Sequence, residues 1–348
     1  MNNRVHMKNF TLFICFFILC AFSTFSAEIA KPKEGEGIYQ FLRNNGRNPV
    51  DYYDSFVELN KNKLGKNQLL MMGVSYTLPP LATGKLSSTS SDSKSTEVKS
   101  GAKNTFVEPL FGKKYSEYTI QSKKLAGATF YLVSGHGGPD PGTIGYVNGT
   151  AIHEVEYAYD VMLRLARSLM MEGATVHVII QDKQNGIRDD ALLKLNKNKT
   201  CMGKVIPRSQ VARLQQRCDE INVLSSKSKN AYQRAVFIHL DSRSVQQKVD
   251  VFFYYNEKSA PGKRLANTMR TTFKNQYQKH QPNRGFEGTV SSRSLHVLNN
   301  TNTVSLFAEL GNIQNSFDQK RFIDSGQRQA LAKWMCLGLI ADYENSKK

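Results

Sequence analysis

Cysteine is scarce in this 348-residue chain, which has five, and no two of them form a Cys-x-x-Cys pair. A metal site would therefore have to use histidine and carboxylate ligands. Two of the five fall in an N-terminal leader described below, which leaves Cys201, Cys218 and Cys336. An odd number cannot form a complete disulfide framework, so either Cys201 pairs with Cys218 or all three are buried thiols.

Long hydrophobic runs are missing after residue 27, so no later segment is predicted to cross a membrane. Before that point, Arg4 and Lys8 precede an apolar run over residues 10–22, and small residues follow up to Ala27. This layout is typical of a secretory signal peptide over residues 1–27, because its apolar run is short for a membrane span. We therefore expect an exported protein, periplasmic or associated with the cell wall, without stable membrane insertion.

Acidic residues are also few. The chain has 29 Asp and Glu against 47 Lys and Arg, a formal net charge of +18, which favours anionic partners. Zinc-finger spacing, a recognition-helix pattern and aromatic RNA-binding motifs are all absent, so nucleic acid is not expected as a partner. For an exported protein, the expected partner is cell-wall polymer or an anionic membrane surface.

Apolar residues nearly disappear between residues 87 and 100, where nine of fourteen residues are Ser or Thr. Such a stretch cannot bury enough surface to fold and is typical of a flexible linker. We therefore expect a small module at 28–80, a linker at 81–106 and a large module at 107–348.

Strand-like and helix-like segments alternate in the large module. Buried strands are expected at 128–134, 174–180, 235–240, 249–255 and 304–310. Between the first two, apolar residues recur at helical spacing from Ala158 to Leu169, and a terminal helix is expected after the N-cap candidate Asp324. This alternation predicts an α/β fold with a mostly parallel twisted sheet flanked by helices.

Metal-capable and acidic residues stand where these strands end. His136 follows the first strand between glycines, His239 ends the third strand and Glu309 ends the last, while Glu154 precedes the long helix. In open α/β sheets, chemistry collects at the carboxyl edge of the strands. Two imidazoles and one carboxylate form a ligand set of catalytic Zn²⁺, and Glu309 would then be free to take a proton from water. The glycines beside His136 would leave space for a bulky substrate.

Each of these residues also has a purely structural interpretation. The glycine-rich stretch around His136 is compatible with a tight loop, and His239 with a core histidine at a strand end. Glu154 is compatible with a first-turn acid favoured by the helix dipole, and Glu309 with a buried acid paired with an arginine. Their common placement at the ends of separate segments favours one shared site.

Five segments occur in the order found in zinc-dependent N-acetylmuramoyl-L-alanine amidases: SGHGGPDPGTIG, HEVEYAYDVMLRLARSLMMEGATV, LQQRCDEIN, FIHLDS and SLFAELGNIQN. On these segments, residues 126–342 resemble the Amidase_3 family. The resemblance implies that His136, Glu154 and His239 are zinc ligands and that Glu309 is the catalytic glutamate. It further implies a zinc-hydroxide mechanism, with Glu309 as general base, that hydrolyses the amide between the lactyl group of N-acetylmuramic acid and L-alanine in peptidoglycan.

The chain departs from the family pattern in two places. His239 is followed by Leu240-Asp241 where the family usually has Ala-Asn, and Asp241 is expected to orient a ligand or to contact substrate. The stretch between Asp182 and Arg217 is longer than in compact relatives. It is expected to be a surface elaboration or, over residues 186–210, a segment that gates the cleft. His153 offers an alternative metal donor, but it is expected to face solvent.

The small module resembles a LysM domain, a βααβ fold that binds N-acetylglucosamine units of peptidoglycan or chitin. The resemblance rests on Gly-Glu-Gly-Ile at 35–38, on Leu59-Asn60 and on Gly-x-x-Tyr-x-x-Pro from Gly73. Two apolar helical faces are expected, formed by Ile38, Phe41 and Leu42 and by Tyr52, Phe56 and Leu59. Because the usual first strand is altered, a spacer without affinity for sugar is the alternative.

The leading prediction is an active zinc amidase joined to a glycan-binding module, with peptidoglycan as its partner and an activating protein that the sequence does not identify. Two alternatives stay open. One is a catalytically silent wall-binding protein, which the presence of all four expected site residues disfavours. The other is a zinc peptidase that acts on stem peptides.

Overall fold

The computed structural model describes residues 28–33, 36, 38–47, 49–65, 70–81, 105–241 and 245–347. The predicted signal peptide, two glycines of the predicted LysM-like start (Gly35 and Gly37) and nearly all of the predicted linker lie outside the described residues. Within the described ranges, no helix is both long enough and apolar enough to span a membrane.

The first described elements follow the βααβ order that the sequence predicts. They are β1 (Ile29–Ala30), α1 (Ile38–Asn44), α2 (Pro49–Asn60) and β2 (Tyr76–Thr77). β1 and β2 pair antiparallel around a core of Ile38, Phe41, Leu42, Phe56, Tyr76 and Leu78.

The expected apolar face of α2 is wrong at Leu59, whose side chain is 50% exposed. Asn60 takes the inward position instead. Its amide nitrogen donates to the Thr77 carbonyl at 2.8 Å, and its amide oxygen accepts from the Thr77 N–H at 2.8 Å. The end of α2 is therefore attached to β2 by hydrogen bonds rather than by an apolar contact.

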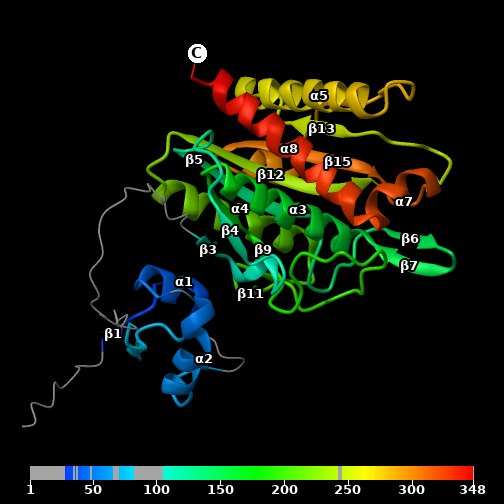
Figure 1. Ribbon diagram of the computed structural model, residues 1–348. Helices are drawn as coiled ribbons and strands as arrows, with labels where there is room; N and C mark the ends of the chain where they lie inside the picture. The colour runs from blue at the N-terminus through cyan, green and yellow to red at the C-terminus, as the bar shows by residue number, and fades with distance from the viewer. Residues whose placement is uncertain are drawn as a thin grey trace, which may run out of the picture.

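A six-stranded sheet forms the centre of the large unit, in the order β14-β13-β15-β12-β5-β8 (Figure 1). The strands are β5 (Ala128–Ser134), β8 (Thr175–Val178), β12 (Tyr232–Asp241), β13 (Phe252–Tyr255), β14 (Thr289–Ser292) and β15 (Val304–Asn312). Strands β8, β5, β12 and β15 run parallel, and only the β13–β15 pair is antiparallel. The predicted α/β fold with a mostly parallel sheet is confirmed.

Helices cover both faces of this sheet, which explains why every residue of β5 is buried. The helices are α3 (Glu154–Met171), α4 (Gln210–Lys227), α5 (Ala260–His280), α6 (His296–Asn300), α7 (Ser316–Ile323) and α8 (Ser325–Asn345). α8 packs against α3 and α5, which contact the strands on one face (Figure 1). α4 packs against α6 and returns the chain to β12 on the other side, as right-handed crossovers require.

The large unit also contains short strands that form small sheets separate from the central one. β3 (Thr105–Val107) pairs with β4 (Glu117–Thr119), with the 3-10 turn η2 (Pro109–Phe111) between them, and β6 (Ile144–Val147) forms a hairpin with β7 (Thr150–His153). The long stretch before α4 forms a small antiparallel sheet of β9 (Ile180–Gln181), β10 (Thr200–Cys201) and β11 (Lys204–Val205).

The strand order creates a switch point between β5 and β12. After β5 the chain crosses through α3 to β8 on one side, and it then returns through α4 to β12 on the other side. In such sheets, the crevice at the carboxyl ends of the strands opens at this point. His136 comes directly after β5, His239 lies near the end of β12, and Glu309 is the Cα partner of His239 on β15. The topology therefore brings these residues to one edge.

Candidate active site

Three of the predicted site residues meet at the switch point. One ring nitrogen each of His136 and His239 and one carboxylate oxygen of Glu154 all lie within 4.8 Å of one another. Glu154 Oε2 is 3.0 Å from His136 Nε2, and Glu154 Oε1 is 3.0 Å from His239 Nδ1. No second group of this kind occurs in the part of the chain that the structure describes.

The Glu154 carboxylate is fixed between the two rings by the backbone. The N–H of Thr143 donates to Oε2 at 3.0 Å, and the N–H of Leu240 donates to Oε1 at 3.1 Å. Burial opposes ionisation of this carboxyl, but the two imidazoles outweigh it and hold its pKa well below its usual range. Glu154 is thus a buried carboxylate with a single orientation, as a metal ligand needs.

Gly135, which directly follows β5, is required at this site for a steric reason. A Cβ atom on Gly135 would overlap the ring of His239, so only glycine lets the end of β5 come this close to β12. The following loop is tight, because His136, Gly137 and Gly138 all have positive φ angles of 59°, 112° and 60°. The interpretation as a tight loop and the interpretation as a site therefore both apply.

The two histidines differ in their electrostatic surroundings. Burial works to lower the pKa of His136, but the carboxylates of Glu154 and Asp140 outweigh it and raise the pKa to about 10. Burial lowers the pKa of His239, although Glu154 opposes this effect. The His239 ring also stacks on Phe307, with ring centroids 4.4 Å apart. A metal ion at this cluster would displace the proton of His136.

Asp140 is a site residue that the sequence analysis missed. Its Oδ2 lies 2.9 Å from His136 Nδ1, and Arg213 Nη2 lies 2.6 Å from the same oxygen. Because Nδ1 faces Asp140, the atom that His136 presents to Glu154 is Nε2. The only hint in the sequence was its position four residues after a candidate metal ligand. Its pairing with Arg213 could not be predicted, because the two residues are 73 positions apart.

Glu309 lies beside the cluster on the neighbouring strand. Its Oε2 is buried and has no hydrogen-bond partner among the described residues. Burial and then the carboxylates of Glu154 and Asp241 raise the pKa of Glu309 well above its ordinary value. A group of this kind takes up a proton readily, and a nearby cation would favour its ionised form.

The two remaining candidates differ from the three clustered residues. Asp241 ends β12 opposite Asn312, and its carboxylate acts electrostatically on Glu309. Its role in orienting a ligand or contacting substrate stays a prediction. His153 is the last residue of β7 and does not belong to the cluster. Its Nδ1 is buried without a partner among the described residues, so the ring does not simply face solvent.

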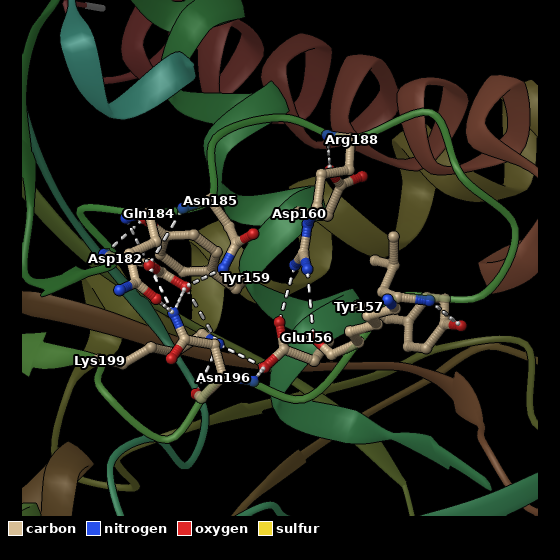
Figure 2. Close-up of polar contacts among 12 residues, drawn as sticks. Glu156, Tyr157, Tyr159, Asp160, Asp182, Gln184, Asn185, Arg188, Asn196 and Lys199 are labelled. Carbon is tan, nitrogen blue, oxygen red and sulfur yellow. Dashed lines mark hydrogen bonds and ion pairs between the residues drawn. The ribbon is translucent and has the colours of Figure 1, made fainter.

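The stretch after β9 is tied to α3 by buried charges (Figure 2). Glu156, two residues after Glu154, accepts hydrogen bonds from Arg188 Nη2 at 2.7 Å, from the Asn196 N–H at 2.8 Å and from Lys199 Nζ. The side chains of Glu156 and Lys199 are fully buried. Farther along, Ile206 packs against the loop of His136, where a Cβ on Gly138 would lie 2.8 Å from its own Cβ. This stretch therefore forms part of the wall around the site.

Cys201, Cys218 and Cys336 are free and buried in the structure. Burial raises the pKa of Cys201 and of Cys336 to about 12, so neither thiol ionises readily at neutral pH.

Comparison with known proteins gives one family match. Residues 131–341 match the model of the Amidase_3 family, described as N-acetylmuramoyl-L-alanine amidase. No curated protein matches the chain.

Three similar solved structures are amidases of low sequence identity. An N-acetylmuramoyl-L-alanine amidase from Clostridium difficile 630 is 19% identical, with a TM-score of 0.45, covering 64% of this chain and 98% of that one. The CwlD amidase from Clostridioides difficile, in complex with the GerS lipoprotein, is 19% identical, with a TM-score of 0.45 and coverages of 62% and 98%. The amidase AmiC2 of Nostoc punctiforme is 18% identical, with a TM-score of 0.44 and coverages of 64% and 99%.

Proposed function

The chain belongs to the Amidase_3 family of N-acetylmuramoyl-L-alanine amidases, and from this premise we propose that it is a zinc-dependent hydrolase of peptidoglycan. The bond cleaved is the amide between the lactyl group of N-acetylmuramic acid and L-alanine of the stem peptide. The observation that carries the proposal is the cluster of His136, Glu154 and His239 beside Glu309, whose buried Oε2 has no hydrogen-bond partner among the described residues; all four lie within the matched residues.

The donor set fits zinc. Two neutral imidazole nitrogens and one carboxylate oxygen are ligands that catalytic Zn²⁺ uses, and three protein ligands leave a position for water or substrate. His136 Nε2, Glu154 and His239 would hold the ion, and the hydrogen bond between His136 Nδ1 and Asp140 would orient the first ring. When bound, zinc would polarise the scissile carbonyl and make water more acidic.

Glu309 would carry the proton through the reaction. Its Oε2 would accept a proton from the attacking water while the water oxygen bonds to the lactyl carbonyl carbon. It would then return a proton to the alanine nitrogen as the carbon–nitrogen bond breaks. The raised pKa supports this role, because a carboxyl group whose two protonation states are close in energy both accepts and donates.

Product analysis of digested peptidoglycan tests the proposal. Mass spectrometry should find stem peptides that begin with a free L-alanine amino group, together with intact muramyl sugars, and a chelator should abolish their release. Peptides that begin at a later residue would identify a peptidase. A zinc-loaded protein that releases nothing would be a silent wall-binding protein.

Glu309→Gln tests the proton carrier. This substitution keeps the shape of the side chain, so zinc content should stay near normal while turnover falls by roughly 10²- to 10⁴-fold. Glu257→Gln is the matched control, since Glu257 is exposed in the loop before α5 and should leave turnover unchanged. Undiminished turnover in Glu309→Gln would reject the assigned role.

We also propose that residues 28–80 bind the glycan strands of peptidoglycan and that the protein acts after export. The βααβ order and the hydrogen bonds between Asn60 and Thr77 support a compact LysM-like module. Deleting residues 28–100 should weaken co-sedimentation with insoluble cell wall and spare activity on soluble fragments. Unchanged sedimentation would contradict the LysM-like function.

A further inference from the structure

Helix α4 contacts the loop of His136 through two arginines one turn apart. Arg213 and Arg217 are separated by four residues, so their side chains lie on the same face of the helix. Arg217 donates a hydrogen bond to the carbonyl of His136, and Arg213 forms an ion pair with Asp140. Both contacts fall on the loop that presents His136 to the other site residues.

Asp140 connects Arg213 to the His136 ring. One carboxylate oxygen, Oδ2, lies 2.6 Å from Arg213 Nη2 and 2.9 Å from His136 Nδ1. The other oxygen accepts from the Gly142 N–H at 3.1 Å. The guanidinium is itself held, because its Nη1 donates to the carbonyl of Arg208. The carboxylate therefore has fixed partners on both oxygens and can hold the imidazole in one orientation.

The partial burial of this pair distinguishes it from an ordinary surface ion pair. The side chain of Arg213 is 12% exposed and that of Asp140 is 24% exposed. Solvent and salt screen such a pair less than a fully exposed one, so its geometry is better maintained.

The backbone preferences of the residues around His136 do little to fix the ring. His136 has a φ of 59°, in the left-handed region that costs an ordinary residue roughly 1–2 kcal/mol. Glycines precede and follow it, and glycine restricts the backbone least. The orientation of His136 must therefore come from other contacts, and α4 supplies one directly, from Arg217 to the His136 carbonyl, and one through Asp140, from Arg213.

We propose that Arg213 is a positioning residue of the metal centre, which acts through Asp140 to hold the His136 ring with Nε2 toward Glu154 and so increases the affinity of the site for zinc. The proposal rests on the proposed function only in taking His136 as a zinc ligand. The Arg213 guanidinium bonds to Asp140 and to the Arg208 carbonyl, so it acts on His136 through Asp140. Its effect is on zinc affinity and on turnover, with little effect on substrate binding.

Zinc affinity of the full chain tests this role. Zinc-free protein would be titrated with Zn²⁺ against a chromophoric chelator for the parent, Arg213→Gln, Arg213→Lys and the control Arg208→Gln. The Arg208 side chain is exposed, and Arg213 bonds only to its backbone carbonyl, so Arg208→Gln removes one positive charge nearby and keeps that contact. Arg213→Gln should raise the zinc Kd by about 10-fold or more, as is typical when a residue that orients a metal ligand is removed. Arg213→Lys should recover part of the affinity, and Arg208→Gln should stay within about twofold of the parent.

Two further measurements separate positioning from simple stabilisation. With zinc in excess, Arg213→Gln should lower kcat while KM on soluble wall fragments stays unchanged. Asp140→Asn should raise the zinc Kd as well, and the double variant should be no weaker than the worse single variant, because both residues act on one contact. Thermal unfolding of each zinc-free variant would confirm that it is folded at the assay temperature.

An unchanged zinc Kd in Arg213→Gln would overturn the proposal, and so would additive losses in the double variant or an equal loss in Arg208→Gln. A parent protein that binds no zinc would also overturn it. A parent that binds zinc with the expected dependence on Arg213 but releases no stem peptides would leave this inference standing and contradict the proposed function.

Discussion

Replacing Lys199 with methionine should strongly destabilise the large unit. The Lys199 ammonium is fully buried, donates to Glu156 and to the Asn196 carbonyl at 3.2 Å, and lies 3.6 Å from Asp182 (Figure 2). Removing one partner of a buried ion pair costs about 3–5 kcal/mol, because a charge is left without compensation. Glu156 keeps its bonds from Arg188 and from the Asn196 N–H, so the low end, about 3 kcal/mol, is expected.

Thermal unfolding followed by circular dichroism measures this effect. For a unit of this size, roughly 2–4 °C are lost per kcal/mol, so Lys199→Met should lower Tm by about 6–12 °C. The matched control is Lys204→Met in the same stretch, since Lys204 is 46% exposed and pairs with Glu220 at 2.7 Å. An exposed pair contributes about 1 kcal/mol or less, so Tm should change by no more than about 4 °C. Equal Tm values for the two variants would refute this reasoning.

Three other substitutions have defined outcomes. Gly135→Ala should displace the His239 ring, because the new Cβ would overlap it, and should weaken zinc binding in a chelator competition; an unchanged Kd would contradict this. Cys336→Ala should flatten the loss of unfolding free energy at alkaline pH in urea titrations. Burial raises the pKa of this thiol to about 12, so its contribution to stability is constant below about pH 9 and falls by up to about 1.4 kcal/mol per pH unit above it, as the thiol of the unfolded chain ionises. An equal slope in parent and variant would argue against a buried neutral thiol. Asn60→Ala should lower the stability of the βααβ unit by about 1–3 kcal/mol, because it leaves both backbone groups of Thr77 without these partners; hydrogen exchange at Thr77 that matches the parent would exclude this.

The strand ends could be predicted from the sequence because parallel strands align their carboxyl edges. His136, His239 and Glu309 each follow or end an apolar run, and the topology of one sheet is enough to bring such positions together. Glu154 could be predicted at this edge because it begins helix α3, which follows β5 in the chain. The N-cap of α8 could also be predicted, because it depends only on neighbouring residues: Asp324 accepts a hydrogen bond from the Gln327 N–H at 3.0 Å.

Contacts between distant polar residues could not be predicted. The stretch from 182 to 209 has little apolar periodicity. Its sequence therefore does not predict that Lys199 is buried against Glu156, 43 residues earlier. The start of β13 was misplaced for a related reason. Val249 was expected in the strand, but its N–H donates to Asp318 and its carbonyl accepts from Arg321, so its backbone is paired with side chains before the ladder begins at Phe252.

The position of β12 in the middle of the sheet has a consequence for when the protein can act. Its neighbours are β5, far earlier in the chain, and β15, which carries Glu309 and arrives some 70 residues later. A chain that has been synthesised only as far as β12 can pair β5 with β12 and yet lack Glu309, the proposed proton carrier. The proposed hydrolysis therefore requires nearly the whole polypeptide, because Glu309 reaches the site only when β15 has joined the sheet.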